Sequence, residues 1–192
     1  MNEFLYLRIK LDHAITFGDD ALALMIAQRG LDLGTQKNLP AEIEYFRAQF
    51  FILEEDFTTA IVHLNKAIDI NPKDGAAFND KALCLVELGQ LDNALENFNK
   101  GILVEPDYAS VYHNKGWLLN KLGLYSDAVE CFLKTLELEP KRAVTYENLG
   151  DAYLNLRLVD DAKKAYNRAL EFLPSDCQGI KEQIEDLLSD LS

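Results

Sequence analysis

The sequence is short of basic residues and of long apolar runs. Among its 192 residues, 19 lysines and arginines stand against 32 aspartates and glutamates, which gives a net charge of −13. A nucleic-acid surface needs clustered Lys and Arg to displace counterions, so this balance argues against a nucleic-acid partner. No stretch approaches the roughly 18 consecutive apolar residues of a membrane span, which argues against membrane insertion. The acidity itself serves solubility or favours a basic partner.

Cysteine is also scarce. Cys84, Cys131 and Cys177 are widely spaced and form no CxxC pair, a usage that fits a reducing compartment. The first residues lack the basic leader and sustained apolar run of a signal peptide, and neither end carries a lipidation signal. We therefore expect a cytoplasmic protein.

The residue types of catalysis and metal binding are present without the spacing that this chemistry needs. His13, His63 and His113 form no HExxH pair or other metal-ligand spacing, and His63 is most simply a surface residue. Phosphate-binding loops and G-x-S-x-G elbows are missing from the sequence. Cys84 and Cys131 are interpreted as small apolar residues rather than nucleophiles. We predict no catalytic residue, no cofactor and no metal, and hence a protein that is not an enzyme.

A 34-residue period organises the chain, and Ala143 to Asp176 show it most completely. That stretch supplies Tyr146, Leu149, Gly150, Tyr153, Ala162, Tyr166, Ala169 and Pro174. The spacing aromatic-x2-Leu-Gly-x2-Tyr, then Ala-x3-aromatic, then Pro resembles the tetratricopeptide repeat (TPR), a helix-turn-helix unit. Three further prolines precede Pro174 at the same interval: Pro72, Pro106 and Pro140.

The resemblance implies an all-α fold, a right-handed superhelical α-solenoid of about five TPR units with a C-terminal capping helix. We expect one array, with a divergent first repeat over 4–40, in which Gly34 lies just past the second helix. Four regular repeats then follow at 41–74, 75–108, 109–142 and 143–176, and a capping helix at 177–192. Ser175 and Asp176 offer N-cap side chains to that helix. Its apolar stripe covers the last repeat or, alternatively, docks onto another subunit: Ile180, Ile184, Leu187, Leu188 and Leu191.

Two recurring positions have a clear physical reason. A small residue in each first helix lies where two helices approach closely: Ala48, Ala82, Gly116 and Gly150. Gly89 and Gly123 suit the tight turn between helices, where a positive φ costs glycine least. Glu55 and Arg157 occupy the matching places in two other repeats, whose turns must form without glycine.

TPR arrays bind partners along a concave side lined by first helices. Because residues four apart share one helix face, the inner and flanking positions can be named from the sequence. The predicted groove residues are Tyr45, Phe46, Gln49, Asn79, Asp80, His113, Asn114, Trp117, Lys121, Glu147, Asn148 and Asp151.

Trp117 is the most informative of these, since it is the only tryptophan and the TPR pattern does not require it. Tryptophan is over-represented in binding hot spots, although Trp117 can instead pack on the neighbouring inner helix. His113 and Lys121 frame it one turn away on either side. Asn114 and Asn148 correspond to the asparagines that hold a peptide backbone in TPR proteins, or they are ordinary polar surface.

Chaperone-binding TPR domains grip an acidic C-terminus with a clamp of Lys, Asn and Arg. Aligned on repeats three to five, this chain offers Asn79, Leu83, Asn114, Val144 and Asn148 at those positions, without the basic residues. An acidic chaperone tail is therefore not the expected ligand. We predict a protein-interaction scaffold for a neutral or basic peptide or helix with an apolar or aromatic anchor. The alternative is a homo-oligomeric structural module that pairs through its terminal helices, at Phe4 to Leu7 or at the C-terminal stripe.

Overall fold

The computed structural model describes residues 3–16, 18–174 and 177–191, and over these the chain is all-α. It contains eleven helices and no strand in those ranges, with 82% of residues helical. This confirms the fold class predicted from the sequence. The helices are α1 (Glu3–Thr16), α2 (Asp20–Gln36), α3 (Pro40–Leu53), α4 (Phe57–Ile70), α5 (Gly75–Glu87), α6 (Leu91–Val104), α7 (Ala109–Lys121), α8 (Tyr125–Leu138), α9 (Ala143–Asn155), α10 (Val159–Phe172) and α11 (Gln178–Asp190).

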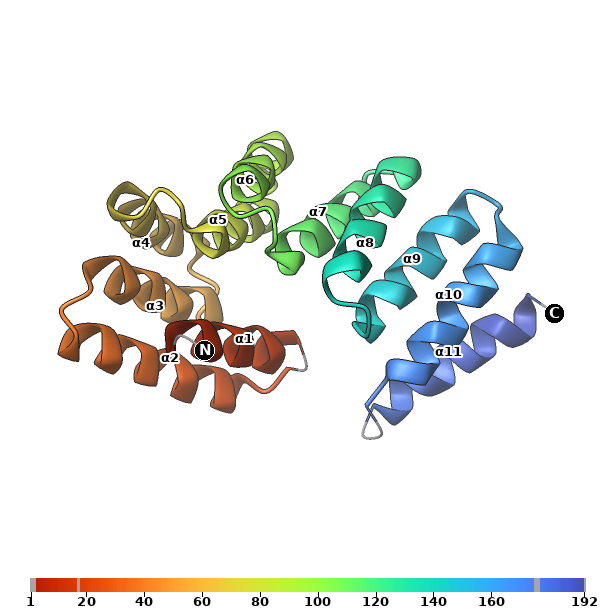
Figure 1. The fold of residues 1–192 in the computed structure, drawn as a ribbon, viewed down its shortest axis with the longest axis horizontal. Coiled ribbons are helices and arrows are strands. Elements are labelled where there is room, and N and C mark those ends of the chain that lie inside the picture. Colours follow the sequence, from red (N-terminus) through yellow and green to blue (C-terminus); the bar gives the residue numbers. More distant parts are fainter. Residues whose placement is uncertain (1–2, 17, 175–176, 192) are drawn as a thin grey trace. The chain divides into compact units, whose positions relative to one another are not determined.

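The helices form two compact units, Met1–Glu105 and Pro106–Ser192, called here unit 1 and unit 2. Unit 1 holds α1 to α6 and unit 2 holds α7 to α11 (Figure 1). Within each unit the two helices of a pair pack together, and the second helix of one pair packs on the first helix of the next. Each helix thus buries one stripe against its neighbours, as TPR pairs do.

In both helix pairs of unit 2, a glycine of the first helix faces an aromatic ring of the second. A Cβ added at Gly116 would lie 2.8 Å from the Phe132 ring, and one added at Gly150 would lie 2.5 Å from the Tyr166 ring. Both rings are fully buried. The close helix approach predicted at the small positions is therefore confirmed where glycine occupies them.

The turns inside the pairs also follow the prediction. Gly89 and Gly123 have φ values of +72° and +78°, and Glu55 and Arg157 adopt the same conformation at +59° and +61°. After Arg157, the N–H of Leu158 donates to the carbonyl of Tyr153 at 2.9 Å. This is the hydrogen bond of a Schellman cap, which requires one residue with positive φ. Two of these turns therefore place a side chain where glycine is preferred.

The end of the first pair differs from the prediction. Gly34 lies inside α2, which continues to Gln36, and Asn38 with a φ of +51° makes the turn instead. A Cβ at Gly34 would lie 3.2 Å from the Ile43 side chain, so this glycine permits the close packing of α3. Pro40 begins α3 at the first helical position, where its missing N–H is harmless.

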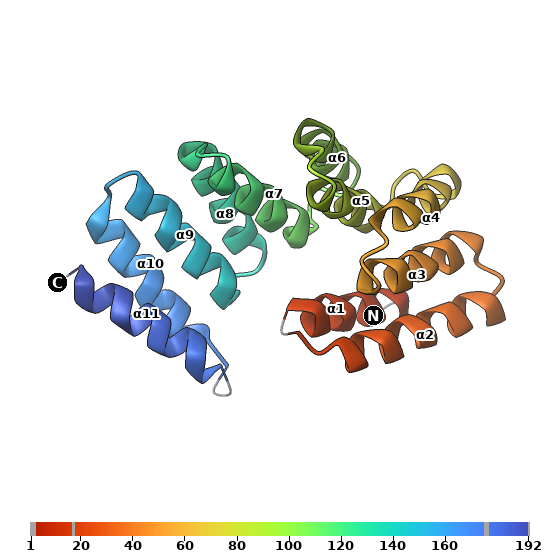
Figure 2. The same ribbon diagram turned by 180° about the vertical axis from the view of Figure 1, so that it is seen from behind.

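The C-terminal helix α11 packs on α10, as Figure 2 shows from behind. Ile184 is buried against Ala162, Tyr166 and Ala169, and the rest of the stripe is partly buried around it. The stripe is thus used within unit 2, as the sequence analysis expected of a capping helix. The proposed N-cap residues Ser175 and Asp176 lie outside the described residues.

Candidate functional site on the first helices

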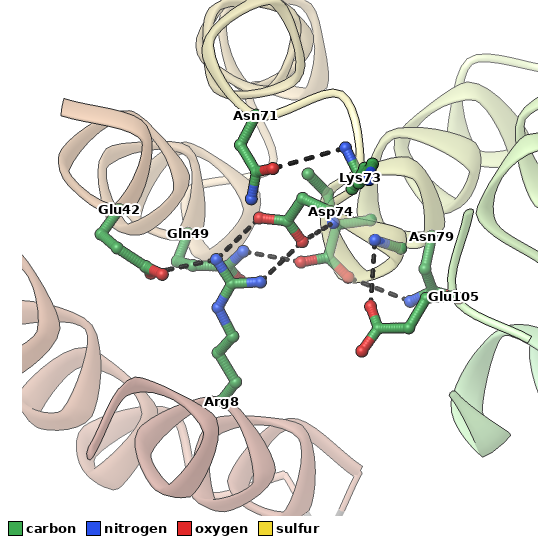
Figure 3. A network of polar contacts seen from close by, with 11 residues as sticks. Arg8, Glu42, Gln49, Asn71, Lys73, Asp74, Asn79 and Glu105 are labelled. Carbon is green, nitrogen blue, oxygen red and sulfur yellow. Dashed lines mark hydrogen bonds and ion pairs between the residues drawn. The ribbon is translucent and has the colours of Figure 1, made fainter. Parts of the chain in front are cut away.

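In unit 1 the side chain of Arg8 extends from α1 to α3 and to the start of α5 (Figure 3). Arg8 of α1 donates from Nη1 and Nη2 to the two carboxylate oxygens of Asp74, at 2.7 and 2.8 Å, and from Nη2 to Glu42 at 3.0 Å. Its guanidinium also lies 3.7 Å from the centre of the Tyr45 ring. Asp74 in turn caps α5 by accepting from the N–H of Ala77 at 3.0 Å. The charge of Arg8 is therefore neutralised within the unit.

A second cluster surrounds Asp80 on the same face. Gln49 Nε2 and Asn79 Nδ2 donate to its two oxygens, at 2.8 and 3.0 Å. Burial raises the pKa of Asp80, and hydrogen bonds from Tyr45, Gln49 and Asn79 oppose that rise. The polar atoms predicted to meet a ligand here already bind one another.

The predicted groove residues of unit 1 are thus corrected by the structure. Tyr45, Gln49 and Asn79 are buried, with exposed fractions of 4%, 2% and 2%. Phe46 is fully buried because its ring packs on α2, in the space that a Cβ at Gly30 would occupy. These side chains hold helices together and present little surface to a partner.

His113 in unit 2 is corrected in the same way. Its ring is buried, and its Nδ1 is hydrogen-bonded to Thr145 Oγ1 of α9 at 2.9 Å. Burial, with a contribution from the positive charge of Arg142, lowers the pKa of His113 from 6.5 to about 3. The imidazole is therefore neutral and links α7 to α9, and it does not frame a ligand.

The other inner positions of α7 stay open. Trp117 is half-buried, and Lys121 one turn later is exposed. The Lys121 ammonium lies 5.3 Å from the centre of the Trp117 ring system, within the range of a cation–π contact. Trp117 therefore presents a partly exposed aromatic side chain next to a charged one.

Two acids occupy the corresponding positions of α9. Glu147 and Asp151 are half-buried and lie one helical turn apart. Burial, and then the charge of Asp151, raises the pKa of Glu147. Burial also raises the pKa of Asp151, although the Tyr166 hydroxyl donates to it at 2.6 Å and opposes this. No lysine or arginine of the described residues is ion-paired with either carboxylate, so their charge is uncompensated.

The two asparagines of the flanking row are half-buried as well. Asn148 donates from Nδ2 to the carbonyl of Val144 on its own helix at 3.0 Å. This bond uses one of its amide donors within α9. Asn114 occupies the matching place on α7.

The histidines and cysteines considered as catalytic or metal-binding residues do not cluster with one another. His63 is half-buried, with Nδ1 2.7 Å from Glu44 Oε2 and its ring stacked on Phe51, so it is not the simple surface residue expected. Burial raises the pKa of the Cys84 thiol to about 12. Over the part of the chain that the structure describes, no three potential metal ligands gather. In the same ranges, no helix is long and apolar enough to cross a bilayer.

Sequence reasoning missed the bond between Arg8 and Asp74. The two residues are 66 positions apart and belong to the first and third pairs. Asp74 directly before Gly75 was a visible helix-capping signal, but its second partner depends on the packing of three helices.

Comparison with known proteins agrees with this architecture. Tetratricopeptide repeat models match residues 51–115, 109–142 and 143–176. The crystal structure of MamA protein has a TM-score of 0.63 at 21% identity, over 89% of this chain and 92% of that one. YrrB, a TPR protein with an unusual peptide-binding site, has a TM-score of 0.60 at 19% identity, over 86% and 84%.

A third structure is the first TPR of Spaghetti (RPAP3) bound to the HSP90 peptide SRMEEVD. It has a TM-score of 0.54 at 21% identity and covers 61% of this chain and 94% of that one. Among curated proteins, none matches the sequence. The repeat models together span residues 51–176, and the chain belongs to the tetratricopeptide repeat family.

Proposed function

We propose that the chain is a non-enzymatic protein-interaction scaffold that binds a basic or neutral peptide on the α7–α9 face of unit 2. The observation that carries this proposal is the uncompensated pair Glu147 and Asp151, which occupies on α9 the positions that His113 and Trp117 occupy on α7. Two acids of unit 1, Glu42 and Asp74, already have Arg8 as their cation. The unit 2 acids lack such a partner among the described residues, and a lysine or arginine of a ligand would supply it.

The energetics of the acidic pair support a binding role. Two half-buried carboxylates one turn apart repel each other and lose hydration, so they destabilise the unit at neutral pH. Residues that lower stability are often retained where function requires them. A cation placed between Glu147 and Asp151 would cancel their repulsion and compensate for the lost hydration.

Trp117 would supply the apolar part of the same site. Tryptophan offers a large apolar area and an N–H donor, and its partial burial fixes the ring in advance of binding. Preorganisation limits the ordering cost of association. Trp117 and Asp151 occupy equivalent positions in successive repeats, so a peptide with an aromatic or aliphatic residue near a cation matches both.

Two of the similar structures are peptide binders by their own descriptions, YrrB and the RPAP3 domain. The RPAP3 peptide is acidic. At the positions where an acidic tail would need basic partners, this chain has Asn79, Val144 and Asn148. It carries Glu147 and Asp151 on α9 instead, so its ligand would have the opposite charge. We place the scaffold in the cytoplasm, in keeping with a sequence that has only three cysteines and no CxxC pair.

The single tryptophan gives a direct assay. Trp117 fluorescence would be titrated with matched peptides that carry an aromatic residue next to arginine, glutamine or glutamate. We expect the arginine peptide to bind best and to weaken with salt. The double variant Glu147→Gln, Asp151→Asn should lose about tenfold or more in affinity, which is about 1.4 kcal/mol.

The controls separate binding from folding. Both substitutions keep the side-chain shape, and the amide oxygen introduced by Asp151→Asn can still accept from the Tyr166 hydroxyl, so the variant should be at least as stable as the wild type at pH 7. Glu87→Gln, on an exposed position of α5 in unit 1, should leave affinity unchanged. The proposal would be refuted if the glutamate peptide bound most tightly, or if the double variant bound the arginine peptide as tightly as the wild type does.

The alternative function is self-assembly through α1. Leu5, Tyr6 and Ile9 are 45%, 50% and 52% exposed on that helix. The C-terminal stripe no longer supports it, because α10 already covers that stripe. A mass that rises with protein concentration and falls back in a Leu5→Glu, Ile9→Glu variant would favour self-assembly.

A further inference from the structure

The side chains around Arg8 form a complete recognition site for a guanidinium group. Asp74 accepts two parallel hydrogen bonds and Glu42 accepts a third (Figure 3). The Tyr45 ring lies against the flat face of the group, 3.7 Å from its central carbon. These three residues belong to α3 and to the cap of α5, whereas Arg8 belongs to α1. Planar, bidentate and stacked contacts select arginine over lysine. We call Glu42, Tyr45 and Asp74 the guanidinium cradle.

The buried ion pair between Arg8 and Asp74 is not the arrangement that would stabilise the fold most. The side chains of Arg8 and Asp74 are only 13% and 4% exposed, so both charges have lost most of their hydration. Arg8 Nε is buried with no hydrogen-bond partner in the described part of the chain. A buried ion pair with an unsatisfied donor is weak evidence for stabilisation, and apolar residues of similar volume often serve better. The cradle is therefore better explained by what it recognises.

Helix α1 is held less completely than the helices that follow. It has a neighbouring pair on one side only within unit 1, and its buried residues are Phe4, Leu7, Leu11 and Ala14. Its outer face exposes apolar side chains, Leu5, Tyr6 and Ile9 among them. Elements with few buried contacts open at the lowest free energy, so the cradle can lose its occupant without unfolding of α3 to α6.

We propose that the guanidinium cradle is a second docking site, which Arg8 fills within the chain and which the arginine of a partner's amphipathic helix takes by displacing α1. The charge of the site fits this occupant, because Glu42 and Asp74 leave a double negative charge when Arg8 withdraws. The partner helix would replace the apolar contacts of α1 and its arginine together. This site lies in unit 1 and is independent of the Trp117 surface.

The first experiment tests the cradle itself. The full-length variant Arg8→Ala would be melted with ethylguanidinium or ethylammonium at equal millimolar concentration. We expect ethylguanidinium to raise the Tm of Arg8→Ala by a few degrees and ethylammonium to leave it unchanged, because a ligand of the native state stabilises it. The wild type, whose cradle is filled, should not respond.

A matched control removes the charge and keeps the fold. In Arg8→Ala, Asp74→Asn the asparagine still caps α5 but no longer accepts two charge-assisted bonds, so ethylguanidinium should have no effect. If Arg8→Ala does not fold, Arg8→Lys serves instead, since lysine keeps a charge but cannot make the stacked bidentate contact. An equal response to both cations, or an equal response of the control, would refute the cradle.

The second experiment tests displacement. A synthetic helix with the sequence of Glu3–Thr16 would be titrated into full-length Arg8→Ala, alongside the same peptide with alanine in place of arginine. We expect at least about tenfold tighter binding of the arginine peptide, with weaker binding to the wild type. Equal affinity of the two peptides would show that Arg8 only holds α1 against α3 and α5, and it would overturn the docking role. A wild-type dimer that disappears in Arg8→Ala would identify a second copy as the occupant and also overturn it.

The outcomes are separable from those of the proposed function. Trp117→Ala should abolish peptide binding on unit 2 and leave the ethylguanidinium response of Arg8→Ala intact. A loss of both in one variant would mean that the two sites are not independent.

Discussion

Replacing Arg157 with glycine should stabilise unit 2, although it removes a side chain. Arg157 has a φ of +61°, and its side chain is exposed. The left-handed conformation costs a non-glycine residue roughly 1–2 kcal/mol. Glycine avoids this cost but has more conformational freedom to lose on folding, about 0.4–1 kcal/mol. The net gain is therefore about 0.5–1 kcal/mol.

The reverse change in the neighbouring repeat is the matched control. Gly123 holds the same turn position at +78°, and a Cβ there would approach nothing nearer than the Tyr125 hydroxyl at 4.0 Å. Gly123→Ala should therefore lose about 0.5–1 kcal/mol through backbone strain alone. The two variants test the same quantity, the free-energy cost of a positive φ in a residue other than glycine. One removes this cost from unit 2 and the other adds it.

Urea unfolding followed by Trp117 fluorescence is the appropriate assay, because the only tryptophan lies in unit 2. A shift of the midpoint at constant m reports a change in stability. We expect a higher midpoint for Arg157→Gly and a lower one for Gly123→Ala. If Arg157→Gly were destabilised while Gly123→Ala was unchanged, the argument from positive φ would be wrong.

Three further changes have definite expected results. The pKa of His113 is lowered to about 3 from 6.5. Its contribution to the free energy of unfolding is therefore complete above pH 6.5 and is lost as the pH falls toward 3, by about 1.4 kcal/mol per pH unit. The urea stability of His113→Gln should depend less on pH over that window than the wild type, and parallel slopes would contradict the assignment. Gly150→Ala should cost about 1–3 kcal/mol by forcing the Tyr166 ring away; a thermal melt like that of the wild type would mean that the helices separate freely. Ile184→Ala should lower the free energy of unfolding by about 2–5 kcal/mol, measured by calorimetry. An unchanged Tm would show that α11 does not stabilise α10.

The helix pairs could be predicted because their determinants are local and periodic. Gly150 and Tyr166 recur one repeat after Gly116 and Phe132, and each such contact forms between adjacent helices. The sequence also predicts the turns without glycine at Glu55 and Arg157, and both residues have a positive φ. Periodicity of this kind carries the fold because each pair repeats the same packing problem.

The candidate site could be predicted only in part. Spacing places Tyr45, His113 and Trp117 on inner faces, but it does not say which of them a neighbouring helix covers. His113 is buried because Thr145 of α9 bonds it, and Phe46 because the absence of a side chain at Gly30 admits its ring. Both outcomes depend on the residue facing each position across the interface, which a single helix pattern does not contain.

The bond between Arg8 and Asp74 also affects how unit 1 folds. Repeat proteins are held by contacts between neighbours, so a terminal pair can fray while the others remain formed. Arg8 joins the first pair to the third across 66 residues, and this contact exists only when all the intervening helices are in place. Loss of α1 therefore removes the partner of Asp74 two pairs away, and melting of α5 releases α1. In hydrogen exchange, the amides of α1 should therefore exchange without those of α3 to α6, whereas any opening that melts α5 should expose the amides of α1 as well.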